Sequence, residues 1–236
     1  MKIQYLSAVA AIALFAAGCS STPQFQTGED AEVTHDGLTR VDRTLMDAVW
    51  ARKDIDVSGI TKVMFHGLGV QYRNDSGPYS GRAGTGSVRT RSSTTEFQLD
   101  ADTRALFEEE IRGAFLEELQ RSTVFTVVDE PGPDVLGIHV GLLDVVSRVP
   151  PDSVGNTRVF LDSVGEATLV LELRDSVSHT VLARAVDRRA AQSSGTMIES
   201  SRPRNRAEVR RLGRRWGQIL RDGLEAMIAD GLSTPE

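Results

Sequence analysis

Cysteine is almost missing from this chain of 236 residues: Cys19 is the single example, so no disulfide can form within one chain. Long apolar runs are missing too, because no segment after the N-terminus approaches the roughly 20 apolar residues that a membrane-spanning helix needs. These two absences exclude a disulfide-stapled scaffold and a protein with several membrane spans. With 40% hydrophobic residues, the chain must stabilise a single domain by packing alone.

Motifs that carry catalysis are also scarce. None of the four histidines belongs to a metal-binding spacing such as His-x-x-x-His, and no Ser-x-x-Lys or Gly-x-Ser-x-Gly nucleophile motif occurs. The glycine string at residues 81–86 has neither the Rossmann nor the Walker order of glycines. His139 stands between two glycines and is expected to be a half-buried residue of a sheet. We therefore predict no catalytic residue, no metal ligand and no cofactor.

Positive charge is in short supply, since 27 Lys and Arg face 33 Asp and Glu and leave a net charge of −6. An acidic chain of this kind argues against nucleic acid as a partner. Lysine occurs only at Lys2, Lys53 and Lys62, and the other basic residues are arginines. A biased genomic base composition explains that preference without any special function.

The N-terminus carries the strongest signal in the sequence. Lys2 precedes an apolar run that ends in LFAAGCSS, with small residues immediately before Cys19. This pattern is typical of a bacterial lipobox, in which residues 1–18 are removed and the cysteine is acylated. The alternative is an ordinary secretory signal cut near Ala17, which would leave a lone thiol in an oxidising compartment. Ser20, where many inner-membrane lipoproteins have aspartate, favours the outer membrane, facing the periplasm.

The remaining chain divides into a linker and one domain. Residues 19–40 lack hydrophobic periodicity and predict a flexible tether, whereas residues 41–236 predict a single α/β domain. Within the domain, a stretch rich in Gly, Ser and Arg at residues 72–95 predicts a mobile loop.

Hydrophobic periodicity predicts two helices and about five strands in this domain. The helices are expected over residues 100–121, capped by Asp100 or Asp102, and over residues 205–230, beginning at Asn205. The strands are expected at residues 63–65, 124–128, 135–146, 167–174 and 180–190. The last two are close enough in sequence to form an antiparallel hairpin. The expected fold is α+β: a two-layer sandwich with a mostly antiparallel sheet of about five strands and both helices on one face.

Arginines crowd around the start of the second predicted helix. They are Arg202, Arg204, Arg206, Arg210, Arg211, Arg214 and Arg215. Cations in a first helical turn oppose the helix dipole, so something is expected to compensate them. Either the acidic face of the first helix pairs with them, or they form a face that binds an anionic partner such as lipid head groups or an acidic protein.

Parts of the chain resemble a widespread family of bacterial lipoproteins built on a domain of unknown function. The similar stretches are residues 50–64, 132–145 and 167–189, within a resemblance that spans about residues 45–230. The residues in register are Asp144, Arg174, Asp175, Asp187 and Arg188. Lys53, Asp54 and Ile60 depart from the Pro, Gly and Tyr usual in that family. The resemblance implies an envelope lipoprotein and carries no catalytic residue across.

These observations favour a lipid-anchored protein of the bacterial cell envelope that binds a partner and is not an enzyme. Its expected partners are the membrane, through the lipid on Cys19, and either an envelope protein or anionic lipid head groups. An envelope hydrolase or an anionic-lipid-binding protein is the alternative.

Overall fold

The computed structural model describes residues 23–54, 56–73, 96–150, 158–192 and 197–230. These residues form an eight-stranded sheet, a separate two-stranded sheet and two helices. In chain order the elements are β1 (Gln24–Phe25), β2 (Thr39–Asp42), β3 (Ala48–Ala51), β4 (Lys62–Tyr72), α1 (Ala101–Leu119), β5 (Thr126–Val128), β6 (Val135–Ser147), β7 (Phe160–Leu161), β8 (Gly165–Asp175), β9 (Val181–Ala191), β10 (Ile198–Glu199) and α2 (Arg202–Asp230).

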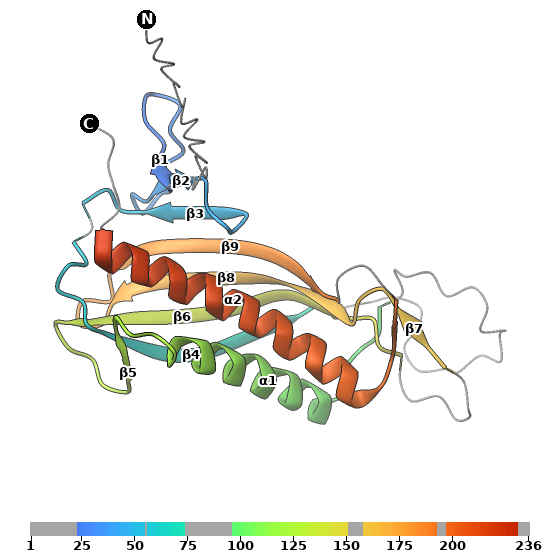
Figure 1. Cartoon of the computed structure of the whole chain (residues 1–236). Coiled ribbons are helices and arrows are strands. Elements are labelled where there is room, and N and C mark those ends of the chain that lie inside the picture. The colour runs from blue at the N-terminus through green and yellow to red at the C-terminus, as the bar shows by residue number, and fades with distance from the viewer. Residues whose placement is uncertain (1–22, 55, 74–95, 151–157, 193–196, 231–236) are drawn as a thin grey trace, which may run out of the picture.

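The large sheet is mixed, with the strand order β1-β2-β3-β9-β8-β6-β4-β5 (Figure 1). β4 pairs in parallel with both β5 and β6, and the other neighbouring pairs of this sheet are antiparallel. β4 and β5 run in the same direction because α1 carries the chain back between them. β8 and β9 form the predicted antiparallel hairpin, in which Leu171 lies opposite Ala185.

The predicted two-layer sandwich with a mostly antiparallel sheet of about five strands is therefore wrong. The large sheet has eight strands, and β10 pairs with β7 in a second sheet. β1, β2 and β3 were missed because each has at most four residues, too few to show an alternation of apolar and polar side chains. β4 continues past its predicted end at Phe65, through two glycines, as far as Tyr72.

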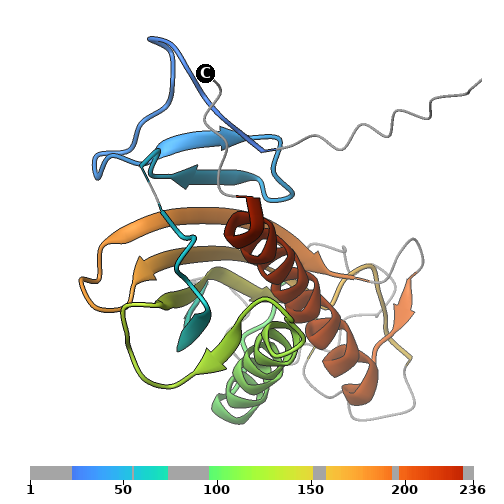
Figure 2. The same cartoon turned by 60° about the vertical axis from the view of Figure 1, so that its left-hand side comes forward.

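Both helices lie side by side across one face of the large sheet (Figure 1 and Figure 2). They approach closely because α2 presents glycine to α1. A Cβ at Gly213 would lie 2.9 Å from the Cβ of Ala114, and one at Gly217 would lie 3.0 Å from the Cβ of Glu118. The fully buried ring of Trp216 belongs to the core under α2. The helix-covered face thus holds the main hydrophobic core.

The predicted helix signals are mostly confirmed. The Asp100 carboxylate accepts a hydrogen bond of 2.7 Å from the backbone N–H of Thr103 and so caps α1. α2 begins at Arg202 rather than at the predicted Asn205, whose side-chain amide donates to the Ser200 hydroxyl. In the part of the chain that the structure describes, neither helix has the length and apolar character of a membrane span.

The predicted tether at residues 19–40 differs from the structure over residues 23–40. There, β1 pairs with β2, Phe25 is 5% exposed and Leu38 is completely buried. The polar composition of this segment hid its strand because the short β1 pairs at the edge of the sheet and buries only a few side chains. Cys19 and residues 74–95 of the predicted loop lie outside the described residues.

Candidate functional site

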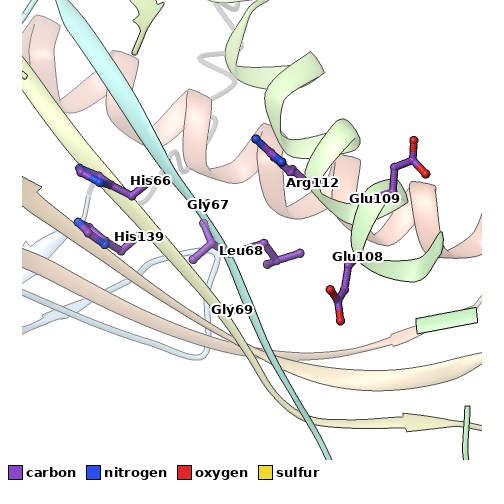
Figure 3. A pocket seen from close by; sticks show the side chains of 9 residues that line it. His66, Gly67, Leu68, Gly69, Glu108, Glu109, Arg112 and His139 are labelled. Atoms are coloured by element: carbon purple, nitrogen blue, oxygen red, sulfur yellow. The ribbon is translucent and has the colours of Figure 1, made fainter. Parts of the chain in front are cut away.

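A cavity of about 690 Å³ opens where β4 passes α1. Its floor is β4 itself around residues 67–69, and Figure 3 shows α1 side chains on one side of β4 and two histidines on the other. The lining residues are His66, Gly67, Leu68, Gly69, Glu108, Glu109, Arg112, His139 and Val140. Within the part of the chain that the structure describes, neither Gly67 nor Gly69 has a heavy atom within 4 Å of the position of a Cβ, so the glycines leave this part of the strand open.

The two histidines come from neighbouring strands and stack on each other. His66 belongs to β4 and His139 to β6; their ring centroids are 4.1 Å apart and their planes differ by 11°. A β-bulge lies between Phe65 and Leu68, where the register with β6 shifts and Gly67 adopts φ of +118°. Gly137 leaves room for the imidazole of His66, whose Nε2 would lie 3.1 Å from a Cβ at that position. The bulge and the missing Cβ together permit the stack.

The environment of the pair disfavours the charged form of His139. Burial is the first cause that lowers the pKa of His139, and the charges of His66 and Arg174 add to it. The buried Nε2 atom of His139 has no hydrogen-bond partner among the described residues. On the next strand, burial opposes ionisation of Glu172, but hydrogen bonds from Arg174 and Arg184 outweigh it and lower the pKa of that carboxyl. Glu172 is thus paired with Arg174 and Arg184.

The helix side of the cavity is polar. Glu108 accepts a hydrogen bond of 3.0 Å from the hydroxyl of Tyr72, whose pKa is raised far above its usual value by burial and by this carboxylate. The Arg104 guanidinium lies 4.5 Å from the centroid of the Tyr72 ring. Glu109 and Arg112 are exposed. Among the described residues, no carboxylate bonds to either stacked histidine, and no group of three His, Cys, Asp or Glu is placed to hold a metal ion.

The outer edge of β4 is open beside this cavity. β5 pairs only with residues 62–64 of β4. Beyond them, residues 65–72 have β6 on their inner side and no strand on their outer side within the described ranges. Leu68 and Val70 on this edge are partly buried against the core. The open stretch is therefore an ordered strand whose outer side has no paired strand among the described residues, and its residues 66–69 line the cavity.

Three of the predicted arginines are placed against α1. Arg206 donates to Glu110, Arg210 to Glu110 and Glu117, and Arg214 to Glu117. The hydrogen bond from Arg206 is the main cause that lowers the pKa of Glu110, and the one from Arg214 is the main cause for Glu117. Two interpretations of the arginine cluster were open. At these three positions the arginines pair with the acidic face of α1.

The other arginines of the cluster have different surroundings. Arg211 pairs with the buried Glu208 at 2.5 Å, and Arg204 lies 4.0 Å from Glu199. Arg202 also makes a contact, and Arg215 is exposed.

The residues that carry the family resemblance make structural contacts in the fold. Arg73 and Arg188 both pair with Asp144, which has φ of 54° at a bulge in β6. Arg174 pairs with Glu172 at 2.5 Å. The remaining two residues stabilise a turn and the core. Asp175 accepts a hydrogen bond from the backbone N–H of Ser178, and the buried Asp187 accepts one from the indole N–H of Trp216.

The stacked pair was not predicted from the sequence. His139 was expected as a half-buried sheet residue, and it lies partly buried in β6 as expected. No role was predicted for His66, because no sequence spacing links it to His139, which is distant in the chain. The sequence has a glycine next to or near each histidine, at Gly67 and Gly137. These glycines could have indicated the stack, but glycine alone does not show that a strand contains a bulge.

Comparisons with known proteins identify the family of the chain but no activity. The model of the family described as "Protein of unknown function (DUF3313)" matches residues 32–219. Among curated proteins, none matches the chain.

Several solved structures are similar. A PelC dodecamer from Paraburkholderia phytofirmans is 7% identical with a TM-score of 0.34, and the match covers 72% of this chain and 96% of that one. A Xanthomonas campestris protein of the family DUF330 is 12% identical with a TM-score of 0.36, over 72% and 84%. A putative neuraminyllactose-binding hemagglutinin homologue from Helicobacter pylori is 8% identical with a TM-score of 0.32, over 73% and 87%. Such low scores carry no argument about function.

Proposed function

Since the chain belongs to the family described as "Protein of unknown function (DUF3313)", we propose a function from its own geometry. It is a lipid-anchored accessory protein of the bacterial cell envelope that binds an extended segment of a partner protein along the open edge of β4. The proposal includes no catalytic step.

The open edge of β4 is the observation that carries this proposal. An extended peptide can add a strand to an exposed sheet edge, where main-chain hydrogen bonds supply affinity and neighbouring pockets supply specificity. Among the described residues, the stretch 65–72 offers such an edge beyond β5, and the cavity beside residues 67–69 gives side chains of the peptide a place to enter. Edges of this length are usually shielded, because an unshielded edge pairs with other chains.

The lipid anchor rests on the sequence pattern around Cys19. Acylation there would place the domain at the membrane, in the outer membrane facing the periplasm. Only five peptide steps separate Cys19 from Gln24 at the start of β1, and they span at most about 18 Å. This short linker supports a domain held at the lipid surface, where its partner would also be a membrane-associated protein.

The binding surface can be tested by photo-cross-linking in cells. A photoreactive residue at Gln71, exposed on β4, should give a heavier adduct, and the same residue at Val177, 61% exposed in the β8–β9 turn, should not. Lysine at an edge disfavours strand addition, so Gly69→Lys should abolish the adduct. Gly59→Lys is the matched control, because that glycine is also exposed and no described residue has a heavy atom within 4 Å of the position of its Cβ.

The outcomes separate the possible occupants. An adduct that Gly69→Lys removes and Gly59→Lys leaves intact supports a partner segment on β4. An adduct with the mass of two copies of this chain would replace the partner by a second copy. An adduct unaffected by Gly69→Lys, or equally strong at Val177, would refute docking on this edge.

The anchor has a separate test. Cys19→Ala should move the protein from the membrane fraction to the soluble periplasmic fraction and abolish incorporation of labelled palmitate. If labelled palmitate is incorporated regardless, Cys19 is not the anchor.

A further inference from the structure

The first three strands place an exposed leucine beside the start of β1. β1 runs antiparallel to β2, with Gln24 opposite Asp42. The chain that precedes Gln24 therefore approaches the sheet at the end where β2 leaves it and enters the turn to β3. Residues 43–47 make up this β2–β3 turn, at the edge of the large sheet that lies opposite to β5 (Figure 1).

Hydrogen bonds from β9 hold the β2–β3 turn in place. The guanidinium of Arg189 donates to the carbonyl oxygen of Leu45 at 3.0 Å, and the backbone N–H of Asp47 donates to Asp187 at 3.2 Å. Between these two contacts, the side chain of Met46 is buried in the core, whereas that of Leu45 is 67% exposed. The turn thus holds one apolar side chain inside the core and the neighbouring one outside it.

We propose that the β2–β3 turn contacts the bilayer, with Leu45 at the boundary between lipid head groups and acyl chains. This inference rests on the lipid anchor of the proposed function. Cys19 lies at most about 18 Å along the chain from Gln24, so the lipid would hold the turn close to the membrane surface. A single exposed leucine is ordinary on a protein surface in water, but beside an acyl anchor it has an apolar phase to enter.

The charges of the turn are compatible with a surface of lipid phosphates. The exposed carboxylate of Asp42 accepts a hydrogen bond of 3.1 Å from the side chain of Gln26. That of Asp47 accepts one of 2.9 Å from the backbone N–H of Arg188. Arg43 is exposed and pairs with no other residue in the described ranges. Its guanidinium is therefore available to a phosphate group, which it can bind through two hydrogen bonds.

Fluorescence quenching of the acylated full chain tests the proposal in vesicles of phosphatidylethanolamine and phosphatidylglycerol. Because acylation consumes the thiol of Cys19, Leu45→Cys supplies the single reactive thiol for a fluorophore. Lipids that carry a nitroxide near the head group should quench about half of its emission. The same fluorophore on Val177→Cys, at a 61% exposed position, should keep its emission. Ala51 of β3 pairs with Ala183 of β9, so the β8–β9 turn lies toward the opposite end of β3 from the β2–β3 turn.

A second pair of variants tests the charge of the turn. Arg43→Glu in the chain labelled at position 45 should reduce the quenching about twofold, because a carboxylate is repelled by lipid phosphate. Lys53→Glu is the matched control, since Lys53 is also exposed but follows the other end of β3, and it should leave the quenching unchanged. Circular dichroism establishes that each labelled variant folds.

The outcomes distinguish this contact from the anchor. A chain that floats with the vesicles, and whose fluorophore is quenched no more at position 45 than at position 177, would overturn the contact and leave the anchor intact. Strong quenching at both positions would overturn it as well, because no particular surface would then face the lipid. Shielding of position 45 in native envelope membranes but not in pure lipid would assign the turn to a protein partner instead. A chain that does not float with vesicles would refute the anchor, and this contact with it.

Discussion

Replacing Asp187 by alanine should destabilise this protein more than most substitutions, although the residue does not lie on the proposed binding edge of β4. Its carboxylate is 1% exposed on β9. It accepts a hydrogen bond of 2.7 Å from the indole N–H of Trp216 and one of 3.2 Å from the backbone N–H of Asp47, and the Arg189 guanidinium also donates to it. The side chain thus ties α2 and the turn before β3 to the same strand.

The magnitude follows from the groups left without a partner. Alanine would orphan the indole N–H of Trp216, which is fully buried, and the backbone N–H of Asp47. Each buried donor that loses its acceptor costs about 1–3 kcal/mol, and breaking a buried charged network costs about 3–5 kcal/mol in all. For a domain of this size, that loss lowers the melting temperature by roughly 10 °C.

Urea denaturation of Asp187→Ala, Trp216→Phe and the double variant measures the coupling directly. A hydrogen bond to a charged acceptor contributes about 1.5–3 kcal/mol, so the double variant should be more stable than the sum of the two losses predicts by about that amount. Asp187→Asn keeps an acceptor and should lose less than Asp187→Ala. A loss below about 1 kcal/mol for Asp187→Ala, or strict additivity, would refute the reasoning.

Two further substitutions or conditions test the packing and the charges. Gly165→Ala should prevent stable folding, because a Cβ there overlaps the carbonyl oxygen of Val146. Thermal melting of the purified variant measures the loss of stability, and a melting temperature equal to that of the parent would contradict the strand pairing. The arginines of α2 hold the pKa values of Glu110 and Glu117 below their ordinary 4.5, so the unfolded chain binds more protons in acid. Their contribution is therefore present above pH 4.5 and lost as the pH falls further, and Glu110→Gln should flatten the fall in urea midpoint between pH 5 and pH 3; an unchanged slope would exclude Glu110 as a contributor.

The sequence predicted elements whose signals are local. Asp100 caps α1 as expected because a cap needs only its own side chain and an N–H three residues later. The alternation between Ala167 and Ala190 predicted β8 and β9 because both strands are long and bury one face. Both signals lie within one element, so they require no knowledge of the partner element.

The full extent of the sheet could not be predicted from the sequence, because the strands that were missed or cut short depend on pairing between distant segments of the chain. β1 has two residues, Gln24 and Phe25, and becomes a strand only through Val41 and Asp42 of β2. The glycines at positions 67 and 69 suggested the end of a strand, yet pairing with Val140 and Gly141 of β6 keeps the chain extended there. The parallel direction of β4 and β6 follows from the path of the chain through α1, which hydrophobic alternation does not encode.

The arginine cluster shows a different limit. Its charge was evident from the sequence, and both its possible partners were named, but choosing between them required the position of α1 relative to α2. Gly213 and Gly217 decide that position because they allow the helices to approach until Arg210 reaches Glu117. The same glycines appear in the sequence only as interruptions of a helical stripe.

Glycine also shapes the open edge of β4 and the histidine stack beside it. A glycine inside a strand costs roughly 0.5–1 kcal/mol relative to alanine, so Gly67, Gly69 and Gly137 together weaken two neighbouring strands at the place where the sheet is open. Gly69 leaves the edge free for a segment, while Gly67 and Gly137 let His66 reach His139. Because these effects come from different positions, Gly69→Lys should abolish docking, whereas Gly137→Ala, whose Cβ meets the His66 ring, should leave docking intact. Loss of docking in Gly137→Ala would mean that the stacked histidines belong to the docking site.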